Sequence, residues 1–214
     1  MYNLPRYREK DKKVIKDFIS AYPFAFLSGC DLDGRPTATQ LPLFLENSNG
    51  KEVLRGHLMK GTDHHKAFLH NENVLAVFTG RHTYVSATWY QNPNTASTWN
   101  YMSVHVKGVL RFVNEDELAE ILQMTSLHFE GQNQRSATVY DNLPEDFKRR
   151  TLQLIAGFEI EVEEIDAVFK LSQDNDVDSY HNIIRKLKEL DEDGRTIASE
   201  MEKRTELLFP KHTE

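Results

Sequence analysis

The longest regular pattern in the chain runs from Met102 to Phe112, where apolar and polar residues alternate. Its even positions are apolar or glycine, and its odd positions include Ser103 and Lys107. Alternation with a period of two predicts a strand with one buried face. Gly108 lies on that face, and a glycine there relieves crowding at a bend, which a sharply curled sheet requires. We therefore expect a barrel, and an ordinary long hairpin strand is the alternative.

Several shorter apolar runs, bounded by turn residues, precede this segment at regular spacing and predict further strands. They cover residues 24–30, 37–45, 52–58, 74–78 and 84–90, and an alternating run predicts a strand over 158–163. Pro42 interrupts the second run, and because proline offers no ladder donor, that point must lie at an edge or a bulge. Apolar spacing and caps predict helices over 11–21, from Gly61 to about 71, after Asn114, from Pro144, and from Val177 to Asp193-Gly194.

Together these elements predict an α+β, mainly β fold: an antiparallel barrel with peripheral helices and a helical C-terminal tail. We expect a barrel domain over residues 1–172 and a C-terminal helical extension over 173–214. Beyond Arg195 only Ile197 and Met201 are well placed to pack, so we expect a weakly docked or partner-bound helix there.

Composition narrows the class of protein. The 26 Lys and Arg residues against 33 Asp and Glu give a net charge of −7, which provides no general attraction for nucleic acid or anionic lipid. The single cysteine, Cys30, excludes an intrachain disulfide and any cysteine-rich metal site. The apolar runs are strand-sized and the N-terminus lacks the apolar core of a secretory signal, so we expect a cytoplasmic protein without a membrane segment.

Several familiar chemical motifs are missing from the sequence. It contains no G-x-G-x-x-G nucleotide fingerprint, no G-x-S-x-G elbow and no H-E-x-x-H zinc motif. Four histidines (His57, His64, His65 and His70) fall close together, but no two are four residues apart, the spacing that puts two ligands on one helical face. We therefore expect solvated or hydrogen-bonded histidines and no metal site.

One basic segment stands out in this acidic chain, running from residue 55 to residue 66. A strand end followed by a glycine and a helix start leaves several backbone N–H groups pointing one way. These donors, the Thr62 hydroxyl and the cations Arg55, Lys60 and Lys66 would suit a phosphate group. A capped helix with a solvated basic face explains the pattern equally well.

Five large aromatic residues form a second candidate group: Tyr84, Trp89, Tyr90, Trp99 and Tyr101. Such side chains can wall a flat ring system or form the centre of a subunit interface. Simple packing in the core is the alternative for each of them.

At these residues the sequence resembles the PaiB family, described as FMN-binding negative transcriptional regulators. That family lies within the FMN-binding split-barrel superfamily, which includes pyridoxamine phosphate oxidase. The matching stretches are Leu54-Arg55-Gly56-His57-Leu58, Tyr84-Val85-Ser86 with Trp89-Tyr90, Thr98-Trp99-Asn100-Tyr101 with Val104-His105 and Gly108, and Lys170-Leu171-Ser172-Gln173. The similarity runs from about residue 1 to residue 190.

The resemblance implies a split β-barrel that forms a homodimer and binds FMN near the interface. It implies that phosphate is held by Arg55, His57, Lys60, Thr62 and Lys66. It further implies that the segment with Trp99 and Asn100 lines the pocket or the dimer seam together with Lys170, Ser172 and Gln173. The family description implies a role in repressing transcription.

An enzyme on the same barrel is the alternative, either a flavin-dependent reductase or oxidase or a haem-handling relative. A bound flavin would accept hydride or electrons, with the protein supplying orientation and electrostatics. His57 and His105 are the only acid–base candidates, and no catalytic residue is assigned. We do not expect direct DNA contact from this chain alone, because acidic residues surround the basic residues of its C-terminal helix.

Overall fold

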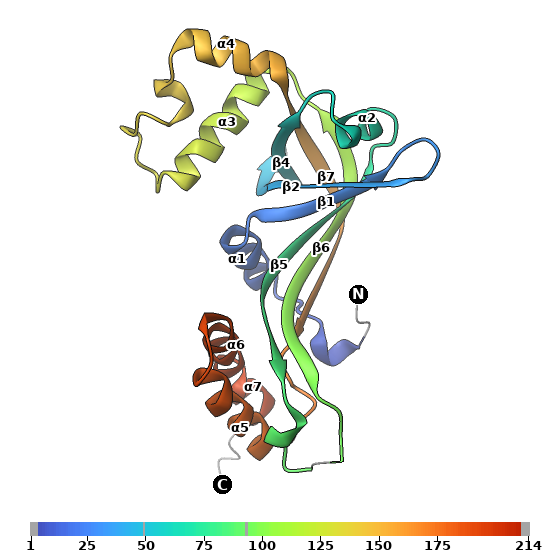
Figure 1. The fold of residues 1–214 in the computed structure, drawn as a ribbon, viewed down its shortest axis with the longest axis vertical. Coiled ribbons are helices and arrows are strands. Elements are labelled where there is room, and N and C mark those ends of the chain that lie inside the picture. Colours follow the sequence, from blue (N-terminus) through green and yellow to red (C-terminus); the bar gives the residue numbers. More distant parts are fainter. Residues whose placement is uncertain (1–3, 49, 93, 211–214) are drawn as a thin grey trace. The chain divides into compact units, whose positions relative to one another are not determined.

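The structure, a computed structural model, describes residues 4–48, 50–92 and 94–210 of the 214-residue chain. The chain forms two compact units. Unit 1 contains Met1–Phe18, Thr79–Val104 and Asp166–Glu214, and unit 2 contains Ile19–Phe78 and His105–Ile165. Three long strands contribute residues to both units: β5 (Asn73–Val85), β6 (Thr98–Phe112) and β7 (Ile155–Lys170) (Figure 1). The domain division at residue 172 stays a prediction.

Unit 2 contains the four other strands: β1 (Phe24–Cys30), β2 (Pro36–Pro42), β3 (Phe44–Ser48) and β4 (Lys51–Met59). β1 pairs with β2 and β5, β3 with β4, and β4 with β7, all antiparallel. The strand order is β2-β1-β5-β6-β7-β4-β3. The run predicted as one strand over 37–45 is two strands, because the β2 ladder ends at Pro42 and β3 pairs with a different neighbour. β2 lies at the edge of the sheet, as its prolines require.

Two glycines allow the strands of unit 2 to approach closely. At Gly108 in β6, a Cβ atom would overlap the carbonyl oxygen of Glu161 in β7. At Gly56 in β4, a Cβ atom would lie 3.0 Å from the carbonyl oxygen of Pro42, at the end of β2. The sheet therefore curls into a half-barrel, and the prediction drawn from the inward glycine of the long strand is confirmed.

The helices of unit 2 are α2 (Asp63–Phe68), α3 (Glu115–Phe129) and α4 (Glu145–Leu154), with the short η3 (Tyr140–Asn142) between the last two. Asn114 caps α3 as predicted, since its Oδ1 accepts from the Glu117 backbone N at 3.0 Å and Glu117 Oε2 accepts from the Asn114 backbone N at 3.2 Å. α3 packs on the sheet through buried Leu118 and Ile121. A Cβ atom at Gly157 of β7 would lie 3.1 Å from Leu118, so the helix covers this strand closely.

Unit 1 contains η1 (Pro5–Tyr7), η2 (Ala87–Trp89), α5 (Val177–Lys188), α6 (Glu192–Glu202) and α7 (Thr205–Leu208), and α1 (Lys12–Ala21) begins in it. The strand predicted over 84–90 is wrong, because β5 continues unbroken to Val85 and Ser86 then caps η2. The helix end predicted at Asp193-Gly194 is also wrong. Asp191 caps α6 there, and Gly194 lies inside that helix, where a Cβ atom would stand 2.8 Å from the Leu187 carbonyl oxygen.

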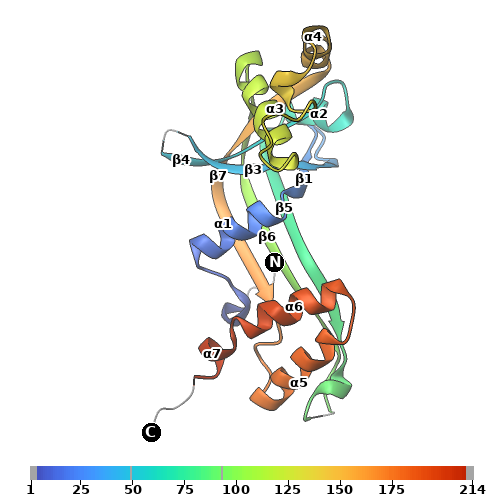
Figure 2. The same cartoon turned by 90° about the vertical axis from the view of Figure 1, so that its left-hand side faces the viewer.

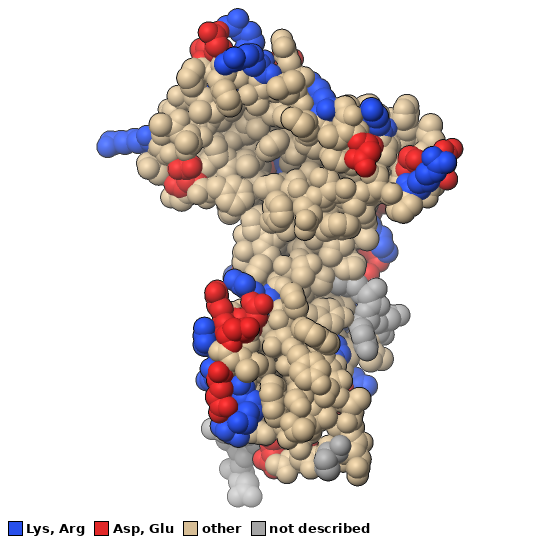
Figure 3. Space-filling view, viewed as in Figure 1, with Lys and Arg blue, Asp and Glu red and all other residues tan. Residues whose placement is uncertain are grey.

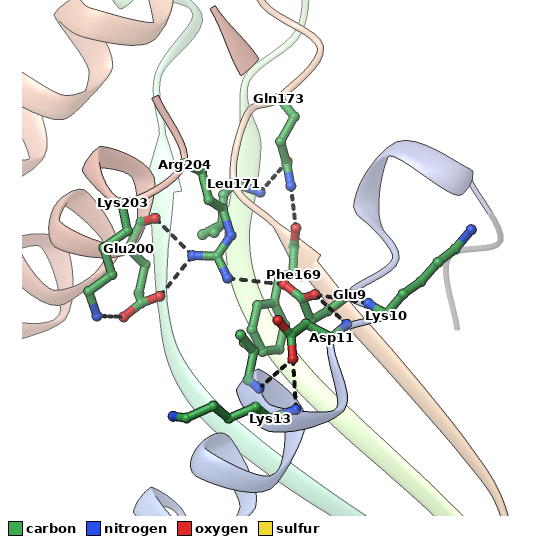
Figure 4. A network of polar contacts seen from close by, with 11 residues as sticks. Glu9, Lys10, Asp11, Lys13, Phe169, Leu171, Gln173, Glu200, Lys203 and Arg204 are labelled. Carbon is green, nitrogen blue, oxygen red and sulfur yellow. Dashed lines mark hydrogen bonds and ion pairs between the residues drawn. The ribbon is translucent and has the colours of Figure 1, made fainter. Parts of the chain in front are cut away.

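The C-terminal helices are firmly packed within unit 1, so the prediction of a weakly docked tail is wrong. Ile197 and Met201 of α6 are fully buried, and α5 and α6 lie side by side (Figure 2). Arg204 then binds Glu9 Oε2 at 3.3 Å and Glu200 Oε2 at 2.8 Å, with its guanidinium 5.2 Å from the centre of the Phe169 ring (Figure 4). The last residues of the predicted tail, 211–214, lie outside the described residues. Among the helices that are described, none has the length and apolar character needed to cross a bilayer.

Candidate functional site

Thr62 begins α2 in unit 2, and its side chain is occupied by capping that helix. Its hydroxyl oxygen accepts from the backbone N of His65 at 3.3 Å and donates to the carbonyl oxygen of Met59 at 2.9 Å. His64 Nε2 lies 3.0 Å from the same hydroxyl oxygen. The helix is capped as the sequence predicted.

Two further backbone donors near this helix start are also taken by nearby side chains. Gly61 donates its backbone N–H to His65 Nδ1 at 3.2 Å, and His64 donates its own to Asp63 Oδ1 at 2.8 Å. Gly61 has a φ of 81°, which a glycine adopts without strain. Since α2 has only six residues and caps itself, side-chain cations rather than helix N–H groups would bind an anion here.

Two lysines, Lys60 and Lys66, are close enough to His65 to affect its pKa. Burial lowers the pKa of His65 most, and the nearby charges of Lys60 and Lys66 lower it further. Lys60 Nζ donates to the Leu152 carbonyl oxygen at 3.2 Å, and Lys66 is exposed on α2. Lys60 and Lys66 thus lie on either side of the start of α2, and their joint role toward phosphate stays a prediction.

Arg55 lies on β4 with its guanidinium surrounded by carboxylates. Its Nη1 lies 3.5 Å from Glu46 and 3.7 Å from Glu120, and its Nη2 lies 3.5 Å from Glu159. The side chain is 17% exposed, and its Nε atom is buried without a hydrogen-bond partner among the described residues. Glu159 also binds Arg111 of β6, whose Nε donates to it at 3.0 Å. Arg55 is therefore ion-paired but has hydrogen-bonding capacity left.

His57 lies two residues beyond Arg55, so its side chain is on the same face of β4. Burial lowers the pKa of His57, which favours the neutral imidazole near neutral pH. His105, the other acid–base candidate of the sequence, is half-buried in β6. Neither position defines a catalytic group.

The second group of predicted residues lies in unit 1, where Lys170 ends β7. Its ammonium donates to the Thr98 hydroxyl and, at 3.0 Å, to the Trp99 carbonyl oxygen. The Nζ atom also lies 5.8 Å from the centre of the Tyr7 ring. Burial lowers the pKa of Lys170. Lys170 thereby joins the end of β7 to the start of β6.

Ser172 and Gln173 shape the chain directly after β7. Ser172 has a φ of 61°, and its hydroxyl donates to Asn100 Oδ1 at 3.0 Å inside the unit. Gln173 accepts from the Leu171 backbone N at 2.7 Å and donates to the Phe169 carbonyl oxygen at 2.6 Å (Figure 4). These bonds stabilise a backbone conformation that a non-glycine residue rarely adopts. Lys170 thus contacts the Trp99 backbone and Ser172 contacts Asn100, and the role of these residues in a pocket or dimer seam stays a prediction.

An exposed aromatic cluster lies on the same unit. Trp99 is 53% exposed, and its ring centre lies 5.9 Å from that of Tyr84 and 6.0 Å from that of His82. His82 was missed from the sequence because it lies in a polar stretch that the apolar pattern excluded. Because His82 lies two residues before Tyr84, a strand here would place both side chains on one face, and this spacing could have predicted the contact. Trp89 is not part of this cluster, and its carbonyl oxygen instead accepts from Asn182 at 2.7 Å.

The predicted site residues therefore form two groups. Arg55, His57, Lys60, Thr62 and Lys66 belong to unit 2, and Trp99, Asn100, Lys170, Ser172 and Gln173 belong to unit 1. Among the residues that the structure describes, no cluster of three His, Cys, Asp or Glu side chains could hold a metal ion.

Comparison with solved structures identifies the fold as the split barrel. The FAD and heme binding protein of Mycobacterium smegmatis superposes with a TM-score of 0.57 at 15% identity, covering 77% of this chain and 73% of that one. The flavocytochrome Anf3 of Azotobacter vinelandii gives a TM-score of 0.54 at 18% identity, covering 76% and 69% of the two chains. The protein is thus an antiparallel split-barrel protein with peripheral helices, as predicted.

The family is shown by the sequence comparisons. Residues 1–164 match the family model described as "Putative FMN-binding domain". The chain is 32% identical over 186 residues to the Bacillus subtilis protein named "Protease synthase and sporulation protein PAI 2", covering 86% of this chain and 88% of that protein. The chain belongs to this PaiB-like FMN-binding family, and FMN is the cofactor that the membership indicates.

The side chains of unit 2 fit the phosphate end of such a cofactor. Arg55 has a buried Nε without a partner among the described residues, and Lys60 and Lys66 supply exposed ammonium groups, so each of the three can donate charge-assisted hydrogen bonds to a phosphate monoester. The start of α2 fits that role less well, because the N–H groups of Gly61, His64 and His65 already have partners.

Proposed function

We propose that this protein is a homodimeric FMN-binding regulator of the PaiB type. The observation that carries the proposal is the match to the FMN-binding family, in a chain that exposes two lysines, Lys60 and Lys66, on either side of the start of α2. In an acidic protein, such a local excess of positive charge favours a doubly charged phosphate monoester.

Each predicted residue has a proposed role toward FMN. Arg55, Lys60 and Lys66 donate to the phosphate, while Thr62 holds the start of α2 and His57 stays neutral beside Arg55. Trp99, Asn100, Lys170, Ser172 and Gln173 line the flavin pocket or the dimer seam. When bound, FMN supplies a ring that can accept hydride or electrons. The residues of the chain bind and orient it.

The proposed homodimer is supported by an exposed apolar stripe on β1. Phe24 and Phe26 are 59% and 43% exposed, and Phe26 pairs in register with half-buried Val77 of β5. Adjacent large apolar side chains exposed on a sheet face are typical of an association surface. Light scattering after gel filtration measures this directly, and a monomeric mass would contradict the dimer.

We propose that regulation acts through a partner or a metabolite rather than by direct DNA contact. Each basic residue of α5 is ion-paired, since Arg185 and Lys186 share Glu189 and Lys188 pairs with Glu202. On the face drawn in Figure 3, Lys and Arg residues are interspersed with Asp and Glu residues. A gel shift that persists above physiological salt would contradict this part of the proposal.

The phosphate site is tested by titrating FMN and riboflavin into the full chain and into a Lys60→Gln/Lys66→Gln variant. Removing two exposed charges should raise the Kd for FMN by about tenfold and leave riboflavin binding unchanged, because riboflavin has no phosphate. Lys12→Gln, an exposed charge change at the start of α1, is the control. Equal effects on both flavins would argue against the site.

Addition of NADH or NADPH tests the alternative function. Bleaching of the bound flavin by either nucleotide would indicate an oxidoreductase.

A further inference from the structure

A row of alternating charges crosses the sheet of unit 2 beneath α3. Arg111 on β6 binds Glu159 on β7, and Glu159 lies opposite Arg55 on β4 in the strand register. Glu159 is 4% exposed and Arg55 is 17% exposed, whereas the Arg111 side chain is 65% exposed. One buried carboxylate is thus shared by two guanidinium groups, of which one is largely buried and the other is exposed.

Helix α3 adds two carboxylates one turn apart to this row. Glu117 is close enough to Arg111 to raise its pKa, although the hydrogen bond to Glu159 contributes most to that shift. Glu120 lies 3.7 Å from Arg55. Because residues three apart share one face of a helix, α3 presents an acidic edge to the two arginines.

Glu120 is the most weakly held partner of Arg55. Its side chain is 71% exposed, and its 3.7 Å separation from the guanidinium is the longest of the three ion pairs. All three carboxylate oxygens lie at least 3.5 Å from the Arg55 guanidinium, and the Nε atom lacks a partner among the described residues. An exposed ion pair of this kind stabilises little, whereas a phosphate can accept two parallel hydrogen bonds from a guanidinium.

We propose that Glu120 competes with the FMN phosphate for Arg55 and thereby sets the affinity of the site for phosphorylated flavin. The inference rests on the proposed function, and it adds an affinity-determining residue that lies on a helix outside the predicted site. Binding of a phosphate monoester displaces the Glu120 carboxylate, while Glu159 continues to hold Arg55 in place. The competition acts through charge, so it affects FMN and not riboflavin.

The test compares Glu120→Gln with Glu115→Gln in the full chain. Glu115 is exposed in the first turn of the same helix, so this control removes an identical charge away from Arg55. Glu120→Gln should lower the Kd for FMN by about two- to fivefold, the range of an exposed ion pair, without changing riboflavin binding. If both variants change the FMN Kd equally, or if riboflavin binding changes as much, the inference is overturned.

A second measurement separates this inference from the proposed function. Inorganic phosphate is titrated while the thermal midpoint of unfolding is recorded, with Arg55→Lys as the variant that loses bidentate binding. Phosphate should raise the midpoint more in Glu120→Gln than in the unchanged chain or in Glu115→Gln. If flavin does not bind but this difference is seen, the proposed function fails and the competition at Arg55 stands. If phosphate affects all three proteins equally, the competition is rejected.

Discussion

Arg55 shows how far single residues could be interpreted from the sequence. The sequence placed it at the end of a strand and close to a helix start, but it lies in the middle of β4 (Lys51–Met59), and α2 begins only at Asp63. Its partners could not be predicted, because Glu46, Glu120 and Glu159 come from β3, α3 and β7 and meet only in the folded sheet. Thr62, in contrast, was predictable as a cap because its partners lie within three residues of it.

Glu159 should be the most important charged residue for the stability of unit 2. Glu159→Gln leaves Arg55 without its buried counter-ion, so we expect a loss of about 3 kcal/mol in the free energy of unfolding. The control is Lys51→Gln, which breaks the Lys51–Glu161 pair between the same two strands. That pair is exposed, so its loss should change stability by less than about 0.5 kcal/mol. Urea unfolding measures both, and equal losses would show that burial of Glu159 does not matter.

His57 should make stability depend on pH. Burial lowers its pKa in the folded state, so the unfolded chain binds more protons once the pH falls below the ordinary histidine value of about 6.5. Stability is complete above that pH and decreases as the pH falls toward the lower pKa of the folded state. Urea unfolding between pH 7.5 and pH 5 should show a shallower decrease for His57→Gln. Part of the decrease should remain, because the pKa of His65 is lowered too. Identical profiles would contradict the role of His57.

At the scale of the elements, the apolar pattern predicted β1 with its correct bounds but stopped β5 too early. The sequence after Phe78 becomes polar, yet the strand continues to Val85 because these side chains have partners elsewhere in unit 1. Arg81 binds Glu192 and Asp193 at the start of α6, and His82 lies against Trp99. Partners this distant in the sequence cannot be found from periodicity.

Gly108 is the element-scale position with the clearest consequence. Because a Cβ atom there would overlap the Glu161 carbonyl oxygen, Gly108→Ala must push β6 away from β7. We expect a loss of about 3 kcal/mol or more in the free energy of unfolding. Val109→Ala, at the adjacent half-buried position, is the control and should cost about 1 kcal/mol. A stability equal to that of the unchanged chain would show that the strands do not approach this closely.

At the scale of the whole molecule, the split-barrel fold and the family could both be predicted. Short motifs in a fixed order carried the resemblance, and the structure places them within β4, at the end of β5, along β6 and at the end of β7. The division into two units could not be predicted, because β5, β6 and β7 are each continuous in the sequence and contribute to both. The packing of α6 was missed as well, since Ile197 and Met201 are too few to reveal a buried face by pattern.

Calorimetric titration of the full chain with FMN, and separately with riboflavin, tests most directly whether the protein binds the phosphate group of FMN. FMN should bind with an affinity at least about tenfold higher than riboflavin, because only FMN has the phosphate that Arg55, Lys60 and Lys66 are proposed to hold. Equal affinity for the two flavins, or no binding of either, would contradict the central claim.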